Sequence, residues 1–229
     1  MARKKKAVQQ RSALEQAQHP DGGFLGGTAT SLVQSLLEAG IDGKGPFDSA
    51  EQVAREALGS EGSVEKAVAK VISAHTRLAA VEGFLTGLGG FITLPVALPA
   101  NVLGFYLLAT RQAAAIAYLR GYSLADPQIR SAVLLSLVGS DGDELLKKAG
   151  VVAPTSAMTN LAAQRLPGPA LMVVNKAVGF RLLTQVGKRS LTRLGKAIPL
   201  AGGVIGAGLD GFLMRSVAKQ ARQEFPAKV

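Results

Sequence analysis

The 229-residue sequence contains no cysteine and no tryptophan, and only two histidines. The absence of cysteine excludes disulfides, thiolate-ligated zinc or iron–sulfur sites and a thiol nucleophile. Two histidines are too few for a multi-histidine metal cluster. Patterns that mark common catalytic sites, such as GxSxG and HExxH, are also missing. We therefore assign no catalytic residue, expect neither a metal nor a cofactor, and expect a protein that is not an enzyme.

Charge is unevenly distributed along the chain. Residues 83–110 contain no Lys, Arg, Asp or Glu, and residues 145–209 contain nine Lys and Arg but no acidic residue. Residues 12–82 instead carry ten acidic residues against five basic ones. The net charge of +10 and the mean hydropathy of +0.24 thus arise from different regions. A long stretch of one sign indicates an anionic partner, and a solvated basic face is the alternative.

The N-terminal region divides into two predicted segments. Residues 1–27 begin with a basic run and lack the apolar core of a secretory signal, so we expect a disordered basic arm on a cytoplasmic protein. Residues 28–62 are predicted to form short helices. Ser31 is expected to cap the first, which Gly40 would end, and Asp48 with Glu51 has the spacing of a capping box for the next.

Residues 63–229 are predicted to form one helical domain, because helical spacing dominates and no convincing run of alternating β-branched residues occurs. The first helix follows Ser63, and its apolar stripe is Val64, Ala67, Val71, Ala74, Leu78, Val81 and Leu85. Other helices are predicted from Pro99 to Arg120 with Gly121 after the end, Pro127 to Val138, Pro169 to Val186, and Pro199 to Glu224. The fold class predicted from the sequence is all-α.

The uncharged residues 83–110 predict a glycine- and proline-interrupted apolar hairpin. Each half is shorter than the roughly 20 apolar residues that a membrane-spanning helix needs. A buried soluble core and a membrane-inserting or interfacial hairpin therefore both remain open, and a true span is the least favoured interpretation. The candidate residues of this apolar hairpin are Phe84, Leu88, Phe91, Leu94, Pro95, Pro99 and Phe105.

A second apolar segment, residues 197–209, is expected to pack against the first. Gly202 and Gly206 have the GxxxG spacing that lets two helices approach closely. Asp210 follows as the only acidic residue between Glu144 and Glu224. Because an isolated buried carboxylate is costly, we predict a buried ion pair between Asp210 and Arg111, with Arg215 as an alternative partner.

The cations of residues 176–196 are predicted to share one side of a helical wheel, with apolar residues opposite. Such a face is typical of a helix at a membrane surface, where each cation contributes on the order of 1 kcal/mol near anionic lipid. Nucleic acid is a less favoured partner, because this stretch has a single aromatic residue for stacking on bases. The candidate headgroup ligands are Lys176, Arg181, Lys188, Arg189, Arg193 and Lys196.

The sequence resembles the EcsC protein family over roughly residues 65–225. The resemblance rests on GFLTGLGGFITLP at residues 83–95, LPAN at 98–101 and IPLAGGVIG at 198–206. It also includes Ile116-Ala117, Gly121-Tyr122 and Asp126-Pro127. It implies a bacterial helical protein of the cytoplasm or the membrane surface and supplies no catalytic residues.

Taken together, these features lead to the hypothesis of a non-enzymatic helical protein that lies peripherally on the cytoplasmic face of the inner membrane. It would bind anionic phospholipid, with sequestration of acyl chains as a further role. The alternative is a soluble helical interaction protein whose basic face binds a protein partner or nucleic acid. An enzyme would require a closed pocket that joins Asp210, Arg111 and a hydroxyl group. The sequence does not indicate an oligomeric state.

Overall fold

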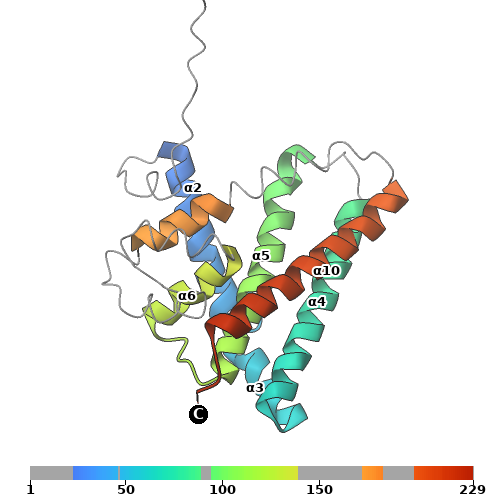
Figure 1. Ribbon diagram of the computed structural model, residues 1–229. Helices are drawn as coiled ribbons and strands as arrows, with labels where there is room; N and C mark the ends of the chain where they lie inside the picture. Colours follow the sequence, from blue (N-terminus) through green and yellow to red (C-terminus); the bar gives the residue numbers. More distant parts are fainter. Residues whose placement is uncertain (1–22, 46, 89–93, 139–171, 183–198, 229) are drawn as a thin grey trace, which may run out of the picture.

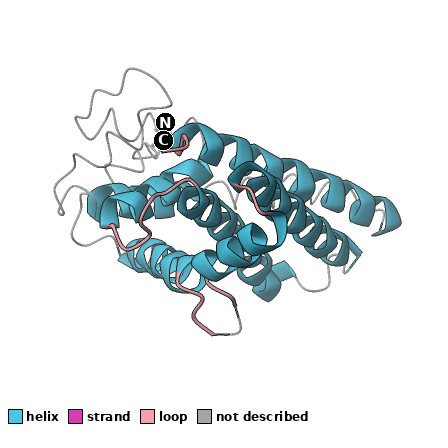
Figure 2. Cartoon of the chain, turned by 90° about the horizontal axis from the view of Figure 1, so that it is seen from below, coloured by secondary structure: helices cyan, strands magenta, loops and turns pink. Residues whose placement is uncertain are grey.

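The computed structural model describes residues 23–45, 47–88, 94–138, 172–182 and 199–228. Helices joined by short loops make up this part of the chain, and it contains no strand (Figures 1 and 2). The prediction of an all-α fold is therefore confirmed. Helix α5 (Leu94–Leu119) lies centrally, with α4 (Val64–Leu88) and α10 (Pro199–Glu224) on one side of it and α2 (Gly23–Ser35) and α6 (Pro127–Val138) on the other (Figure 1).

The N-terminal helix starts earlier than predicted. Helix α2 begins at Gly23, inside the segment assigned to the basic arm, and Ser31 lies within it instead of capping it. It continues into a π-helical turn, η1 (Leu36–Ile41). Gly40 lies within this turn and does not end the helix as predicted, and its lack of a side chain suits the close approach to α5, because a Cβ there would lie 2.9 Å from the Thr110 side chain. Residues 1–22 of the predicted arm lie outside the described residues.

Helix α3 (Ala50–Glu61) has better-defined ends than the sequence suggested. Its N-cap is Ser49, whose side chain accepts a hydrogen bond from the backbone N–H of Gln52 at 3.1 Å, so the predicted capping role of Asp48 is wrong by one residue. The helix continues past Gly59, and Gly62 ends it with a φ of 67°. Glycine suits that position because side chains are disfavoured at positive φ.

Helix α4 follows Ser63 as predicted, but its apolar stripe is buried only in its first half. Ala67 and Val71 are buried, whereas Leu78 and Val81 are 50% and 58% exposed. From His75 onward the buried face shifts, because α10 packs along α4 and covers Thr76 and Ala79 instead. The periodicity therefore identified the helix but not the face that α10 covers.

Helix α5 is the core of the described bundle and contacts η1, α3, α4, α6 and α10. Phe105, Tyr106 and the alanine-rich run 113–117 are buried. It begins at Leu94, so Pro99 lies inside the helix and not at its start as predicted. At the other end Gly121 adopts a φ of 87°, and Tyr122 donates a backbone hydrogen bond to the Ala117 carbonyl at 3.1 Å. This is a Schellman end, as expected for glycine after a helix.

Helix α10 spans the predicted residues and runs antiparallel to α4. Gly211 lies beside Thr76 and Ala80, and farther along the pair Arg222 contacts Glu65. Higher residue numbers in α4 therefore lie beside lower residue numbers in α10 (Figure 1). In this register Leu209 lies near the level of Leu78, about ten residues from the end of α4 and the start of α10.

The acidic segment 28–62 packs into the apolar core through residues such as Leu36, Ile41 and Ala54, and its charges make further contacts with the bundle. The Asp42 carboxylate accepts two hydrogen bonds from the Arg130 guanidinium of α6, at 2.6 and 2.7 Å. Glu51 accepts a hydrogen bond from the Tyr118 hydroxyl of α5 at 3.1 Å. The segment therefore packs with residues 63–138 as one structure.

The helix over residues 172–182 approaches α2 closely at Gly179. A Cβ on Gly179 would lie 2.5 Å from the backbone oxygen of Ala29, closer than any real contact. Backbone cannot rotate away as a long side chain can. This close approach therefore requires glycine.

We predict that Gly179→Ala lowers the free energy of unfolding by about 1–3 kcal/mol, the usual cost of forcing atoms into a packed site. The matched control is Gly59→Ala in α3, where a new Cβ has nothing within 4 Å. That variant should be neutral or gain up to about 1 kcal/mol. Urea unfolding measures both, and equal changes in the two variants would contradict the assigned packing.

Candidate functional site

Exposed apolar side chains gather near the middle of the α4–α10 pair, at the end of the part of the pair whose side chains the structure describes. Of the seven large apolar residues exposed in the described part of the chain, four lie here: Leu78 and Val81 of α4, and Leu209 and Phe212 of α10. Phe212 is 69% exposed. We call these four residues the apolar end. Unpartnered apolar groups gathered in this way are typical of an interaction surface, whereas single exposed ones are ordinary.

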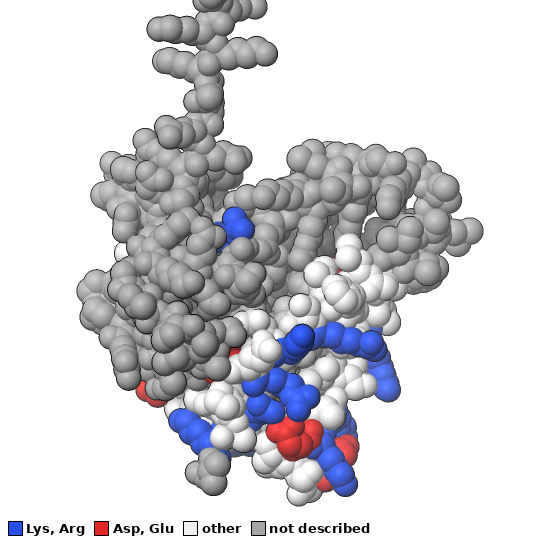
Figure 3. Space-filling view, viewed as in Figure 1, with Lys and Arg blue, Asp and Glu red and all other residues white. Residues whose placement is uncertain are grey.

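Cations follow the apolar end along the same exposed stripe of α10. After Leu209 and Phe212 the exposed residues of that stripe include Arg215, Lys219 and Arg222, each three or four residues apart. Residues at this spacing share one face of a helix. In Figure 3 the blue side chains gather below white surface on the side where α4 and α10 lie.

Arg120, at the C-terminal end of α5, connects three helices at the charged end of this surface. Its Nη1 donates to the backbone oxygens of Arg222 and Phe225, both at 3.0 Å, and its Nη2 donates to Glu65 of α4 at 2.8 Å. Glu65 also accepts a hydrogen bond from Arg222 at 2.9 Å. We call this arrangement the Arg120 clasp. The Arg120 side chain is only 9% exposed.

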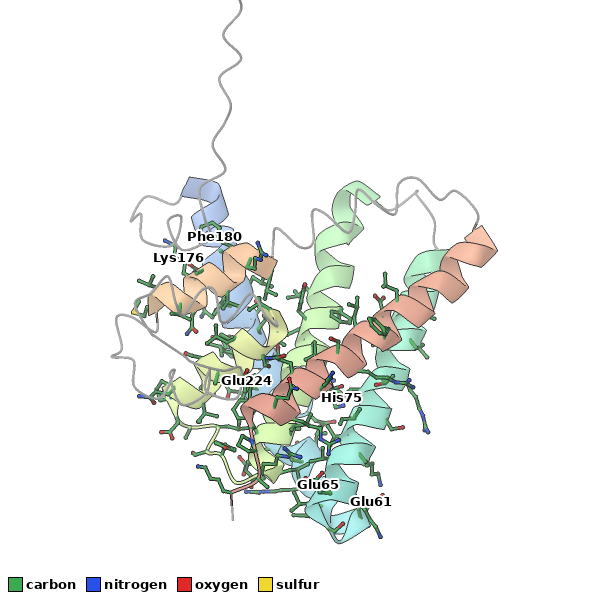
Figure 4. All side chains as sticks on the ribbon, viewed as in Figure 1. Glu61, Glu65, His75, Lys176, Phe180 and Glu224 are labelled. Carbon is green, nitrogen blue, oxygen red and sulfur yellow. The ribbon has the colours of Figure 1, made fainter. Side chains whose placement is uncertain are left out.

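The predicted headgroup residues lie mostly outside the described structure. Lys188, Arg189, Arg193 and Lys196 are not among the described residues. Lys176 and Arg181 lie on the partly buried helix over residues 172–182, on the other side of the bundle from α4 and α10 (Figure 4). Their role in binding headgroups stays a prediction.

The apolar hairpin is described in part. Phe105 is buried and packs edge-on against Tyr106, with ring centroids 5.5 Å apart, so this part of the hairpin belongs to the core. The backbones of α4 and α5 include the positions of Phe84, Leu88, Leu94, Pro95 and Pro99, but the surroundings of those side chains and Phe91 itself lie outside the described structure. The same holds for the contacts of Gly202 and Gly206 in α10.

The predicted ion pair between Arg111 and Asp210 is not formed. Arg111 instead donates a hydrogen bond to the Asp48 backbone oxygen at 3.4 Å, and its guanidinium lies 5.6 Å from the centre of the Phe47 ring. The prediction failed because α5 presents Arg111 to the loop before α3, which the sequence did not place beside it. Asp210 is buried in α10 and makes its own polar contact.

His75 of α4 and Gln112 of α5 are buried polar residues. The Nδ1–H of His75 donates to the Val71 carbonyl oxygen at 2.9 Å, and Gln112 donates to the Met214 carbonyl oxygen of α10 at 3.0 Å. Within the described structure, His75 Nε2 has no hydrogen-bond partner. Burial lowers the pKa of His75 to about 4, with a smaller contribution from the positive charge of Arg111. His75 is therefore a neutral structural residue near neutral pH.

Sequence reasoning missed the cations of α10, although a signal for them was present. Arg215, Lys219 and Arg222 have regular helical spacing. The predicted basic surface was instead placed within residues 145–209, which contain nine cations and no acidic residue. The contribution of Arg120 and Glu65 was not predictable locally, since these residues lie on different helices and meet only after packing.

A comparison with known protein families shows to which family the chain belongs. The sequence matches the EcsC protein family over residues 28–227. The chain belongs to the EcsC protein family. The family match includes residues 28–62, which the motif resemblance had left out, in agreement with the docking of this segment on α5 and α6. No curated protein and no solved structure is significantly similar to this EcsC-family chain. In the described parts of the chain, no helix is long and apolar enough to cross a membrane.

We predict that stability falls as the pH decreases from 7.5 to 5 because of His75. Its pKa is lowered in the folded state, to about 4, whereas an unfolded histidine has a pKa near 6.5. The unfolded chain therefore takes up the proton first, and stability present above pH 6.5 is lost as the pH falls. Relative to His75→Gln, the native chain should lose about 2 kcal/mol of unfolding free energy between these pH values. Urea titrations at both pH values measure this difference, and parallel losses in the two proteins would exclude His75 as the cause.

Proposed function

We propose that this EcsC-family protein is a non-enzymatic, peripheral protein of the cytoplasmic membrane face that adsorbs to anionic phospholipid through the α4–α10 pair. The observation that carries the proposal is the order of side chains along this pair. The apolar end comes first, and the cations of α10 follow it on the same exposed stripe. A membrane surface has the same order, with hydrocarbon beneath a layer of charged headgroups.

The dimensions of α10 fit this arrangement. With a rise of 1.5 Å per residue, Arg215 lies about 4.5 Å and Arg222 about 15 Å from Phe212 along the helix axis. Interfacial segments bury their apolar side roughly 5–10 Å into the boundary between headgroups and acyl chains. When Phe212 and Leu209 enter that boundary, the long side chains of Arg215 and Lys219 on the same helix face can extend to the phosphate groups.

Both parts of the surface contribute to adsorption. Burial of exposed apolar area contributes about 25 cal/mol per Å², and cations near anionic lipid add on the order of 1 kcal/mol each. The two contributions together support reversible binding without insertion of a spanning helix. Sequestration of an acyl chain at the apolar end is the corresponding role in lipid handling.

The proposal predicts that Leu209→Gln with Phe212→Gln weakens binding to vesicles that contain phosphatidylglycerol. Loss of these apolar groups should reduce the partition coefficient at least tenfold, equivalent to about 1.4 kcal/mol. The control is Leu58→Gln with Met172→Gln, because these residues are 38% and 74% exposed, against 39% and 69% for the test pair. Vesicle flotation at low salt measures partitioning, and the control should bind as the unchanged protein does.

Two results would argue against the proposal. Equal flotation with neutral phosphatidylcholine vesicles and anionic vesicles at low salt would exclude a role for headgroup charge. Absence of vesicle binding, together with nucleic-acid binding that falls steeply with salt, would favour the soluble interaction protein instead.

A further inference from the structure

The surface between α4 and the C-terminal ends of α5 and α10 contains an open hollow of about 530 Å³. Four cations line it: Arg120 from α5, and Arg215, Lys219 and Arg222 from α10. Ile72 of α4 and Ala218 of α10 supply apolar surface between them. We call this the cationic hollow. It lies beside the Arg120 clasp and includes two of its residues.

The positive charge of the cationic hollow is only partly neutralised. In the described part of the chain, Glu65 is the one carboxylate that bridges two of its guanidinium groups, which leaves a formal charge of +3 from these four cations and one anion. Among the described residues, neither Arg215 nor Lys219 has an ion-pair or hydrogen-bond partner. Like charges four residues apart on a helix repel each other by a few tenths of a kcal/mol, so an additional anion would relieve this repulsion.

The bridging carboxylate shows what kind of ligand the cationic hollow accommodates. Glu65 uses one oxygen for Arg120 at 2.8 Å and the other for Arg222 at 2.9 Å. A carboxylate is therefore already bound through both of its oxygens between two guanidinium groups at one side. Arg215 and Lys219 lie on α10, about two turns and about one turn before Arg222, and their positive charges favour the binding of a further oxyanion.

We propose that the cationic hollow is a binding site for a phosphate monoester, held by Arg215 and Lys219 beside the Arg120 clasp. A phosphate monoester carries a charge of about −1.5 to −2 at pH 7 and three acceptor oxygens. Guanidinium groups match phosphate geometry with paired hydrogen bonds, and lysine adds a point charge. Ile72 and Ala218 would contact the hydrocarbon part of the ester. A lipid headgroup and a soluble phosphate ester share this chemistry.

A second basic hollow shows why the first one is distinctive. Lys66, Lys70 and Arg77 line a depression on the outer face of α4. Lys70 there pairs with Glu61 at 3.3 Å and donates to the Ser60 hydroxyl at 2.8 Å. Lys66 and Arg77 are separated by eleven residues, which is about 16 Å along the helix. They therefore provide exposed cations that do not converge.

The test compares Arg215→Gln with Lys219→Gln against Lys66→Gln with Arg77→Gln. Each double variant removes two exposed positive charges from described helices, so the net charge is matched. Binding of glycerol 3-phosphate is measured by NMR titration at low salt. The proposal expects the Arg215/Lys219 variant to weaken binding at least tenfold and the Lys66/Arg77 variant to change it less than threefold.

Equal effects of the two variants, or no binding of glycerol 3-phosphate by the unchanged protein, would overturn the assignment of this site. A second experiment, with vesicles, distinguishes a lipid headgroup from a soluble phosphate ester as the ligand. It compares binding to vesicles of phosphatidic acid and of phosphatidylglycerol at equal surface charge. Preference for phosphatidic acid that is lost only in the Arg215/Lys219 variant supports the site with a lipid ligand.

Glycerol 3-phosphate binding without vesicle binding supports the site with a soluble ligand and removes the proposed membrane function. Vesicle binding that persists equally in both variants, without glycerol 3-phosphate binding, keeps the membrane function and overturns the site. The two proposals therefore fail in distinguishable ways.

Discussion

The Arg120 clasp is the interaction on which the arrangement of α4, α5 and α10 depends. One nearly buried guanidinium contacts a carboxylate of α4 and two backbone oxygens near the C-terminal end of α10. Helix ends leave carbonyl groups without intrahelical partners, and a cation there satisfies them and the helix dipole together. The residues that follow reinforce the contact, because the Tyr122 hydroxyl donates to Pro226 and its ring packs against Phe225. This fixes which residues of α4 and α10 lie side by side.

Charge therefore has two separate uses in this protein. In the segment before α4, acidic residues pair with Arg130 and with the Tyr118 hydroxyl, and these contacts add to the apolar packing of the N-terminal helices on the bundle. On α10 the cations outnumber the nearby acids and point outward beside exposed apolar residues. The overall excess of positive charge is thus a property of particular surfaces, and the acidic segment does not neutralise the surface that α10 presents.

Much of the fold follows from local sequence signals. Gly121 ends α5 because glycine tolerates positive φ, and Pro127 and Pro199 begin helices because proline fits the first turn. The failures involve contacts between segments distant in sequence. Leu78 belongs to a regular apolar stripe yet is exposed, because α10 covers the adjacent side of α4. Arg111 turns to Phe47 and Asp48 instead of Asp210. A basic surface was predicted on residues 176–196, and that prediction is still untested, whereas the cations of the candidate surface lie on α10 and meet Glu65 and Arg120 only through packing.

The antiparallel pairing of α4 and α10 also determines where the C-terminus lies. Lys228 lies beside Arg120, since its backbone N–H donates to the Arg120 oxygen at 3.2 Å, and its ammonium group lies 4.3 Å from the centre of the Tyr122 ring. The C-terminus therefore lies beyond the last turn of α10, whereas Phe212 lies near the middle of that helix (Figure 1). In the proposed docking on a bilayer, a fluorophore or fusion partner attached there would lie away from Phe212 and would report on docking without covering the proposed contact residues.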